Sequence, residues 1–170
     1  ILLISSFAMK NPSPMAANII YWSVVTLMGV SLGSIVLSYG RIPDGMGIVA
    51  KAFLITSASF GALSLWGYTT KKDLTGFGTF LIMGLGGRII ASVVNMFMAS
   101  SALAFAISVI GVLIFAGLTA YDTQRLKFMY YQIGGDTRAA AVGTTFGALS
   151  LYLDFINLFL FILRLMSPRN

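Results

Sequence analysis

Five stretches of the chain are each long and apolar enough to cross a lipid bilayer as an α-helix. They are residues 17–39, 48–68, 77–98, 102–121 and 142–166. A spanning helix needs roughly 20 mostly apolar residues, and it must satisfy its own backbone because the bilayer core holds no water. The five stretches therefore predict an all-α fold: a polytopic transmembrane helix bundle that forms a single domain over residues 1–170.

Composition supports this prediction and excludes several kinds of chemistry. The chain is 58% hydrophobic and only 9% charged, whereas a soluble domain carries about 25% charged residues. It contains no Cys and no His, which removes disulfides, thiolate nucleophiles, imidazole bases and the common zinc sites. No nucleophile is paired with a base in any readable motif, so we expect no enzyme, no catalytic residue and no cofactor.

The connections between the apolar stretches carry the punctuation typical of turns. Residues 11–14 (NPSP), 41–45 (RIPDG) and 71–73 (KKD) break the chain, and residues 99–101 (ASS) form a tight connection between antiparallel neighbours. Residues 125–138 form the longest polar connection, and their first part, to residue 132, is expected to prolong the preceding helix. Residues 1–9 are apolar over about half the length of a span, which indicates the end of a further helix.

The basic residues are distributed among the connections. The net charge is +6, but no basic stripe with interleaved aromatic residues exists, so nucleic-acid binding is not expected. Alternate connections differ in charge: Lys10, Lys71, Lys72, Arg125, Lys127 and Arg138 fall on one side, and Arg41, Lys51, Arg164 and Arg169 on the other. The positive-inside rule places the first group in the cytoplasm and the C-terminus outside.

Two aspartates stand out because they lie within or beside apolar stretches. The chain has five acidic residues. Asp154 is about 12 residues, or roughly 18 Å, into its span, and Asp122 ends the preceding span. An ionisable group at such depth is expensive and marks a functional site with a partner. If the two carboxyls meet, they should share a proton and act as a pH-dependent latch. Carboxylates also suit Ca²⁺, so Asp122 and Asp154 are candidate Ca²⁺ ligands. Alternatively, each aspartate merely caps or hydrogen-bonds a neighbouring helix.

Arg88 is a third charge within a span. Three interpretations are open: it pairs with one of the two aspartates, it extends its head group to the membrane surface, or it faces a partner protein. An intramembrane protease with two aspartates is also conceivable, because residues 121–122 (YD) match one half of its usual motif. Residues 153–154 (LD) do not match the other half.

The segments around the two aspartates resemble the last two helices of the Bax-inhibitor (transmembrane Bax inhibitor motif) family. The resemblance rests on residues 121–125 (YDTQR) and 148–159 (ALSLYLDFINLF), with further support from residues 60–64 (FGALS) and 71–74 (KKDL). It extends over essentially the whole chain and is closest to bacterial members. It implies a seven-helix bundle with the last helix near the centre, here with five full spans and the end of an earlier helix.

The resemblance also implies a function. Bacterial members are described as pH-sensitive calcium leak channels whose latch is an aspartate pair on the last two helices, and Asp122 and Asp154 match those positions. Asn157 and Arg88 are then expected polar neighbours. The alternative is a non-conducting accessory subunit bound to a larger membrane complex or protease, which Arg88 favours because the family is apolar there. The expected surroundings are the lipid bilayer of a bacterial inner (cytoplasmic) membrane, with Ca²⁺ as the permeant ion.

Overall fold

The computed structural model describes residues 13–167, which form five α-helices and no strand. The helices are α2 (Pro14–Tyr39), α3 (Gly45–Thr69), α4 (Thr75–Met98), α5 (Ser101–Ile133) and α6 (Thr137–Met166). All five are long and apolar enough to cross a membrane. The prediction of an all-α transmembrane bundle is confirmed. The expected helix end at residues 1–9 lies outside the described residues.

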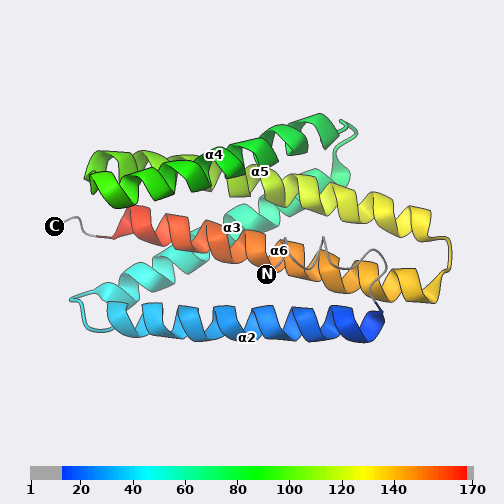
Figure 1. Cartoon of the computed structure of the whole chain (residues 1–170), viewed down its shortest axis with the longest axis horizontal. Helices are drawn as coiled ribbons and strands as arrows, with labels where there is room; N and C mark the ends of the chain where they lie inside the picture. The colour runs from blue at the N-terminus through cyan, green and yellow to red at the C-terminus, as the bar shows by residue number, and fades with distance from the viewer. Residues whose placement is uncertain (1–12, 168–170) are drawn as a thin grey trace.

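The last two helices form the centre of the bundle. α5 packs against α3, α4 and α6, and α6 packs against α2, α3 and α5 (Figure 1). The core consists mainly of side chains from these two helices, including Phe115, Leu118, Leu158 and Leu163. Among the described residues, the backbone of α4 packs closely against α5 alone. A position on α5 or α6 is therefore the most enclosed that the bundle offers.

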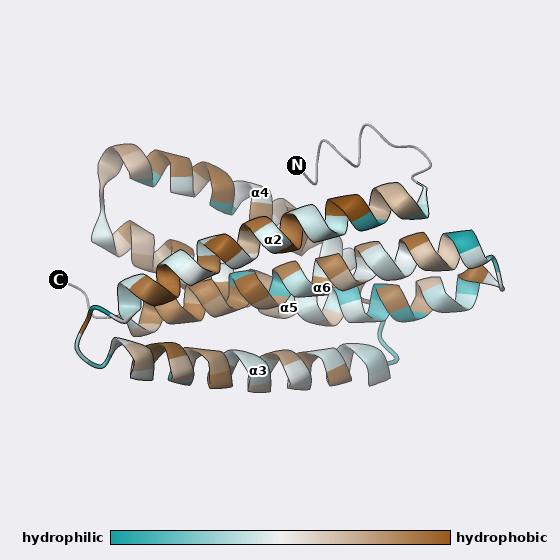
Figure 2. Cartoon of the chain, turned by 90° about the horizontal axis from the view of Figure 1, so that it is seen from below, coloured by the Kyte–Doolittle hydropathy of each residue, from teal (hydrophilic) through white to brown (hydrophobic). Residues whose placement is uncertain are grey.

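The outer helices present apolar side chains to their surroundings, as expected for lipid contact. Leu37 on α2, Leu54 on α3 and Phe97 on α4 are all exposed. Figure 2 shows hydrophobic residues all around the helices, whereas hydrophilic residues gather near the turn that joins α5 and α6. In a soluble protein such large exposed apolar surfaces would promote association, so the pattern supports a membrane environment.

α5 is longer than its apolar stretch. It continues twelve residues beyond the predicted end at residue 121 and stops at Ile133, where Gly134 and Gly135 adopt positive φ angles of 59° and 93°. Its 33 residues rise about 50 Å, more than the roughly 30 Å of a bilayer core. The extension is held by Lys127, whose Nζ donates to the Tyr68 carbonyl of α3 at 2.7 Å. The predicted prolongation of this helix is thus present.

α6 begins five residues before the predicted span. Asp136 caps it: the Oδ1 atom accepts hydrogen bonds from the backbone N–H groups of Arg138 at 3.0 Å and Ala139 at 3.1 Å. Only residues 134–136 separate α5 from α6, instead of the long polar connection expected over residues 125–138. The difference arises because turn chemistry, rather than polarity, ends a helix.

Candidate functional site

Asp122 and Asp154 meet at the interface between α5 and α6. Asp122 is 8% exposed and Asp154 is 4% exposed. The charge of Asp122 acts on Asp154, so the two carboxyls face each other across this interface. A hydrogen bond between two carboxyls requires a shared proton, because an ionised carboxylate has no donor. No described residue forms a hydrogen bond with the buried Oδ2 of Asp154.

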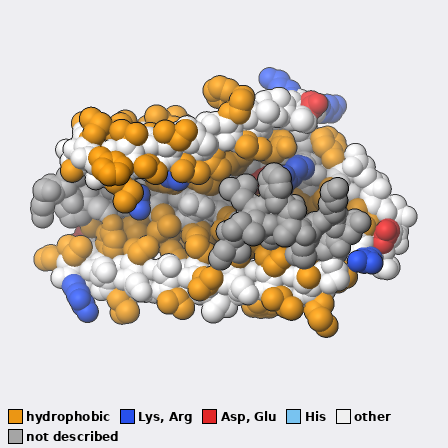
Figure 3. All heavy atoms as spheres, viewed as in Figure 1, with side chains coloured by type: hydrophobic (Ala, Val, Ile, Leu, Met, Phe, Trp, Pro, Cys, Tyr) orange, Lys and Arg blue, Asp and Glu red, His pale blue; other side chains and the backbone are white. Residues whose placement is uncertain are grey.

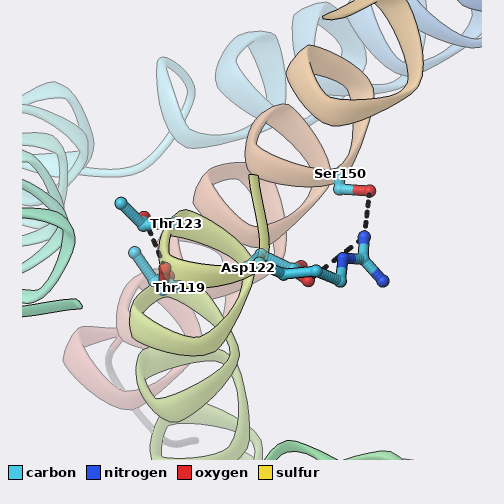
Figure 4. Close-up of polar contacts among 5 residues, drawn as sticks. Thr119, Asp122, Thr123 and Ser150 are labelled. Carbon is cyan, nitrogen blue, oxygen red and sulfur yellow. Dashed lines mark hydrogen bonds and ion pairs between the residues drawn. The ribbon is translucent and has the colours of Figure 1, made fainter. Parts of the chain in front are cut away.

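Arg125 lies at the edge of the pair and links the two helices. Its Nη2 forms an ion pair with Asp122 Oδ1 at 3.3 Å, and it also donates to Ser150 Oγ on α6 at 3.4 Å (Figure 4). The Arg125 side chain is 49% exposed, against 11% for that of Asp122. The positive charge of Arg125 also acts on Asp154. The site is therefore a cluster of two carboxyls and one half-exposed cation.

The nearby threonines do not compete for the aspartates. Thr119 Oγ1 donates to the Phe115 carbonyl at 2.8 Å, and Thr123 Oγ1 donates to the Thr119 carbonyl at 2.7 Å (Figure 4). Both hydroxyls are thereby used within α5. Among the described residues, Arg125 is therefore the one cationic group in contact with the pair.

Neither Arg88 nor Asn157 forms a hydrogen bond or an ion pair with Asp122 or Asp154 in the described residues. Asn157 Nδ2 donates to the Leu153 carbonyl of its own helix at 2.8 Å. The Arg88 guanidinium carbon lies 4.8 Å from the centroid of the Phe161 ring. Phe161 is seven residues after Asp154, about 10 Å farther along α6. Within residues 13–167 Arg88 makes no ion pair, so of the earlier interpretations the pairing with an aspartate is not seen.

Sequence reasoning did not single out Arg125 or Gln124 as site residues. Gln124 is 3% exposed. Its Oε1 accepts from Leu74 N at 2.9 Å, and its Nε2 donates to the Lys72 carbonyl at 2.7 Å. Gln124 therefore anchors the α3–α4 connection beside the pair. The available signal was their place in the polar run 121–125, directly after the buried Asp122.

The aspartate pair is not part of a larger cluster of metal-ligating side chains. Within residues 13–167, no group of three or more acidic or other metal-ligating side chains comes together. Ca²⁺ takes six to eight oxygen ligands, and Arg125 forms an ion pair with Asp122.

The fold and this site define an integral membrane protein whose two central helices share a buried carboxyl pair. A family model described as "Inhibitor of apoptosis-promoting Bax1" matches residues 1–170. The chain belongs to this Bax-inhibitor family, as its two aspartate segments predicted.

Bacterial relatives are similar over nearly the whole chain. A protein of Caulobacter vibrioides is 58% identical over 163 residues, which cover 96% of this chain and 63% of the relative. A protein of Rickettsia prowazekii is 48% identical over 91% of this chain and 63% of its own length. The inner membrane protein YbhL of Escherichia coli is 43% identical over 100% of this chain and 71% of its own length. The chain thus spans less than two thirds of the first two relatives.

Proposed function

We propose that the protein provides a proton-gated leak pathway for cations, Ca²⁺ above all, across a bacterial inner membrane. Asp122 and Asp154 form the gate. The observation that carries the proposal is the meeting of these two buried carboxyls between the two central helices, where Asp154 Oδ2 has no hydrogen-bond donor among the described residues. The membrane follows from the relative YbhL, which is named an inner membrane protein.

The cluster assigns a different role to each carboxyl. Asp122 forms an ion pair with Arg125, so it carries the negative charge of the pair in this proposal. Asp154 is the more buried of the two and farther from water, so it carries the shared proton. In this closed state the proton joins α5 to α6, and the summed charge of the two carboxyls and the guanidinium is zero.

Loss of the proton opens the gate. Two carboxylates in contact within a medium of low dielectric constant repel each other strongly, and the half-exposed Arg125 offsets only part of that repulsion. The helices then separate at the pair, and the exposed carboxylates attract cations. The flux should therefore rise as the pH rises.

The test is a Ca²⁺ flux assay in proteoliposomes that contain the full-length protein. Between about pH 6 and 8, the range in which a buried carboxyl pair can titrate, wild-type flux should increase with pH. Asp154→Asn keeps the shape and the hydrogen-bonding capacity of the side chain but removes the shared proton, so its flux should lose most of this pH dependence.

Asp44→Asn is the matched control. Asp44 is an exposed residue of the α2–α3 turn with a φ angle of 58°, a conformation that Asn also adopts readily. This variant should keep the wild-type curve. An Asp154→Asn protein with an unchanged pH dependence would show that the pair is structural, and the non-conducting accessory subunit would then be the better function.

A further inference from the structure

A cavity of about 690 Å³ lies between α4, α5 and α6, at the end of the bundle where α4 and α6 end and α5 begins. Arg88 on α4 and Arg164 in the last turn of α6 both line it. Figure 3 shows basic side chains between the hydrophobic surfaces of α4 and α6. The cavity arises because the backbone of α4 packs closely against α5 and not against α6.

The two arginines share one aromatic ring and lack an anionic partner within the described residues. Their guanidinium carbons lie 4.8 Å (Arg88) and 5.8 Å (Arg164) from the centroid of Phe161. The Arg88 Nε is buried without an acceptor, and the charge of Arg164 acts on Arg88. The described ion pair, between Arg125 and Asp122, is elsewhere. Two unneutralised cations in a membrane segment are costly, and a cation–π contact offsets only part of that cost.

The polar groups around the cavity favour an anion over any other ligand. The hydroxyl groups of Ser92 and Ser108 donate hydrogen bonds to backbone carbonyls of their own helices, at 3.0 Å and 2.9 Å. Asn95 uses its Oδ1 to accept from Ser100 N at 3.1 Å, which leaves its Nδ2 as a donor. Donors for a ligand are therefore supplied by Asn95 and the two guanidinium groups, and planar guanidinium groups match the oxygens of a phosphate.

We propose that this cavity binds the phosphate group of an anionic phospholipid between Arg88 and Arg164. Arg164, in the last turn of its helix, places the phosphate near the membrane surface, and the cavity extends from there toward Arg88. The acyl chains would lie along the exposed apolar side chains that border the cavity, such as Ile89, Val93 and Met96. The chemistry that is recognised is a phosphate, which the lipid supplies here and which free inorganic phosphate also carries.

Native mass spectrometry of the detergent-purified full-length protein tests the proposal with three probes: phosphatidylglycerol, phosphatidylcholine and inorganic phosphate. Phosphatidylglycerol should bind most tightly because it combines a net negative charge, which phosphatidylcholine lacks, with acyl chains, which inorganic phosphate lacks. Hydrogen bonds to charged groups are worth about 1.5–3 kcal/mol, so Arg88→Gln and Arg164→Gln should each weaken its binding about tenfold or more. Both variants should bind phosphatidylcholine about as weakly as the wild type does.

Arg41→Gln is the matched control, because Arg41 is an exposed arginine in the α2–α3 turn at the same end of the bundle (Figure 1). It should bind phosphatidylglycerol like the wild type. Arg164 is exposed, so its substitution remains informative even if Arg88→Gln fails to fold. Wild-type affinity in the Arg164→Gln variant, equal binding of the two lipids, or displacement of phosphatidylglycerol by millimolar inorganic phosphate would each overturn the proposal. So would a copurified protein that occupies the cavity and excludes lipid.

Discussion

α3 closely approaches the backbone of α5 at Gly67, and a single methyl group there should force the two helices apart. A Cβ atom at Gly67 would lie 2.2 Å from the Ala120 carbonyl oxygen and 2.8 Å from the Ala120 Cα. Real Cβ contacts are essentially never shorter than 3.0 Å. Because the clash is with backbone atoms that cannot rotate away, Gly67→Ala requires the two helix backbones to move apart by about 0.8 Å. Overpacking of this kind costs about 1–3 kcal/mol.

Gly61→Ala on the same helix provides the reference. A Cβ at Gly61 has nothing within 4 Å, and Ala is favoured over Gly in a helix by about 0.5–1 kcal/mol. Both variants gain this preference, so they should differ only by the overpacking at Gly67, about 1–3 kcal/mol in unfolding free energy. Thermal unfolding of the full-length protein in detergent measures this difference, with Gly67→Ala melting several degrees below Gly61→Ala. Equal melting temperatures would refute the close crossing, and with it the placement of Asp122 two residues beyond Ala120.

Three further outcomes are expected. Arg125→Gln should move the midpoint of the pH–flux curve upward by about 0.1–0.7 pH units. This range follows because a half-exposed ion pair is worth about 0.2–1 kcal/mol and one pH unit corresponds to about 1.36 kcal/mol. A midpoint that moves downward would contradict the role of Arg125. Gln124→Ala should destabilise the protein by about 1–3 kcal/mol in a denaturation assay, because it leaves the anchored backbone groups of the α3–α4 connection unpaired. The control Gln132→Ala, at an exposed position, should change stability by less than about 0.5 kcal/mol. Two hydrogen bonds hold the pKa of Asp73 below its ordinary value of 3.8: the larger effect comes from the Thr75 hydroxyl and the smaller from the Thr75 backbone N–H. These bonds to ionised Asp73 therefore stabilise the fold above that value, and their contribution is lost as the pH falls through the folded-state pKa. Thr75→Val should raise the Asp73 pKa measured by NMR, and an unchanged value would show that the hydroxyl bond does not form.

The five helices could be predicted from the sequence because each membrane span is a continuous run of mostly apolar residues. The ends of the helices were harder to predict. The α5 extension carries Arg125 and Lys127, whose charges resemble a loop, yet it remains helical until Gly134 because Lys127 binds the end of α3. Hydropathy records the solvent that a residue prefers, and it does not record where the backbone stops.

The candidate site was partly predictable for a similar reason. The free-energy cost of an unpaired carboxyl group in lipid was enough to predict that Asp122 and Asp154 lie close together. Arg125 was counted only as a charge that orients the chain in the bilayer, because its contact with Ser150 depends on the crossing of α5 and α6. The position of Arg88 also depends on packing: α4 leaves a cavity beside α6, and no local pattern in the sequence encodes that gap.

The proton shared by Asp122 and Asp154 is the central claim, and infrared spectroscopy detects it most directly. A protonated carboxyl group has a C=O stretching band that an ionised carboxylate lacks. The other three aspartates are exposed to water rather than buried beside a second carboxyl, so the comparison with Asp154→Asn isolates the contribution of the pair. We predict a protonated carboxyl band in the full-length wild-type protein at about pH 6 that disappears toward about pH 8. The band should be absent from Asp154→Asn, in which Asp122 faces Arg125 alone. A wild-type protein without the band at pH 6, or an Asp154→Asn protein that retains it, would contradict the shared proton.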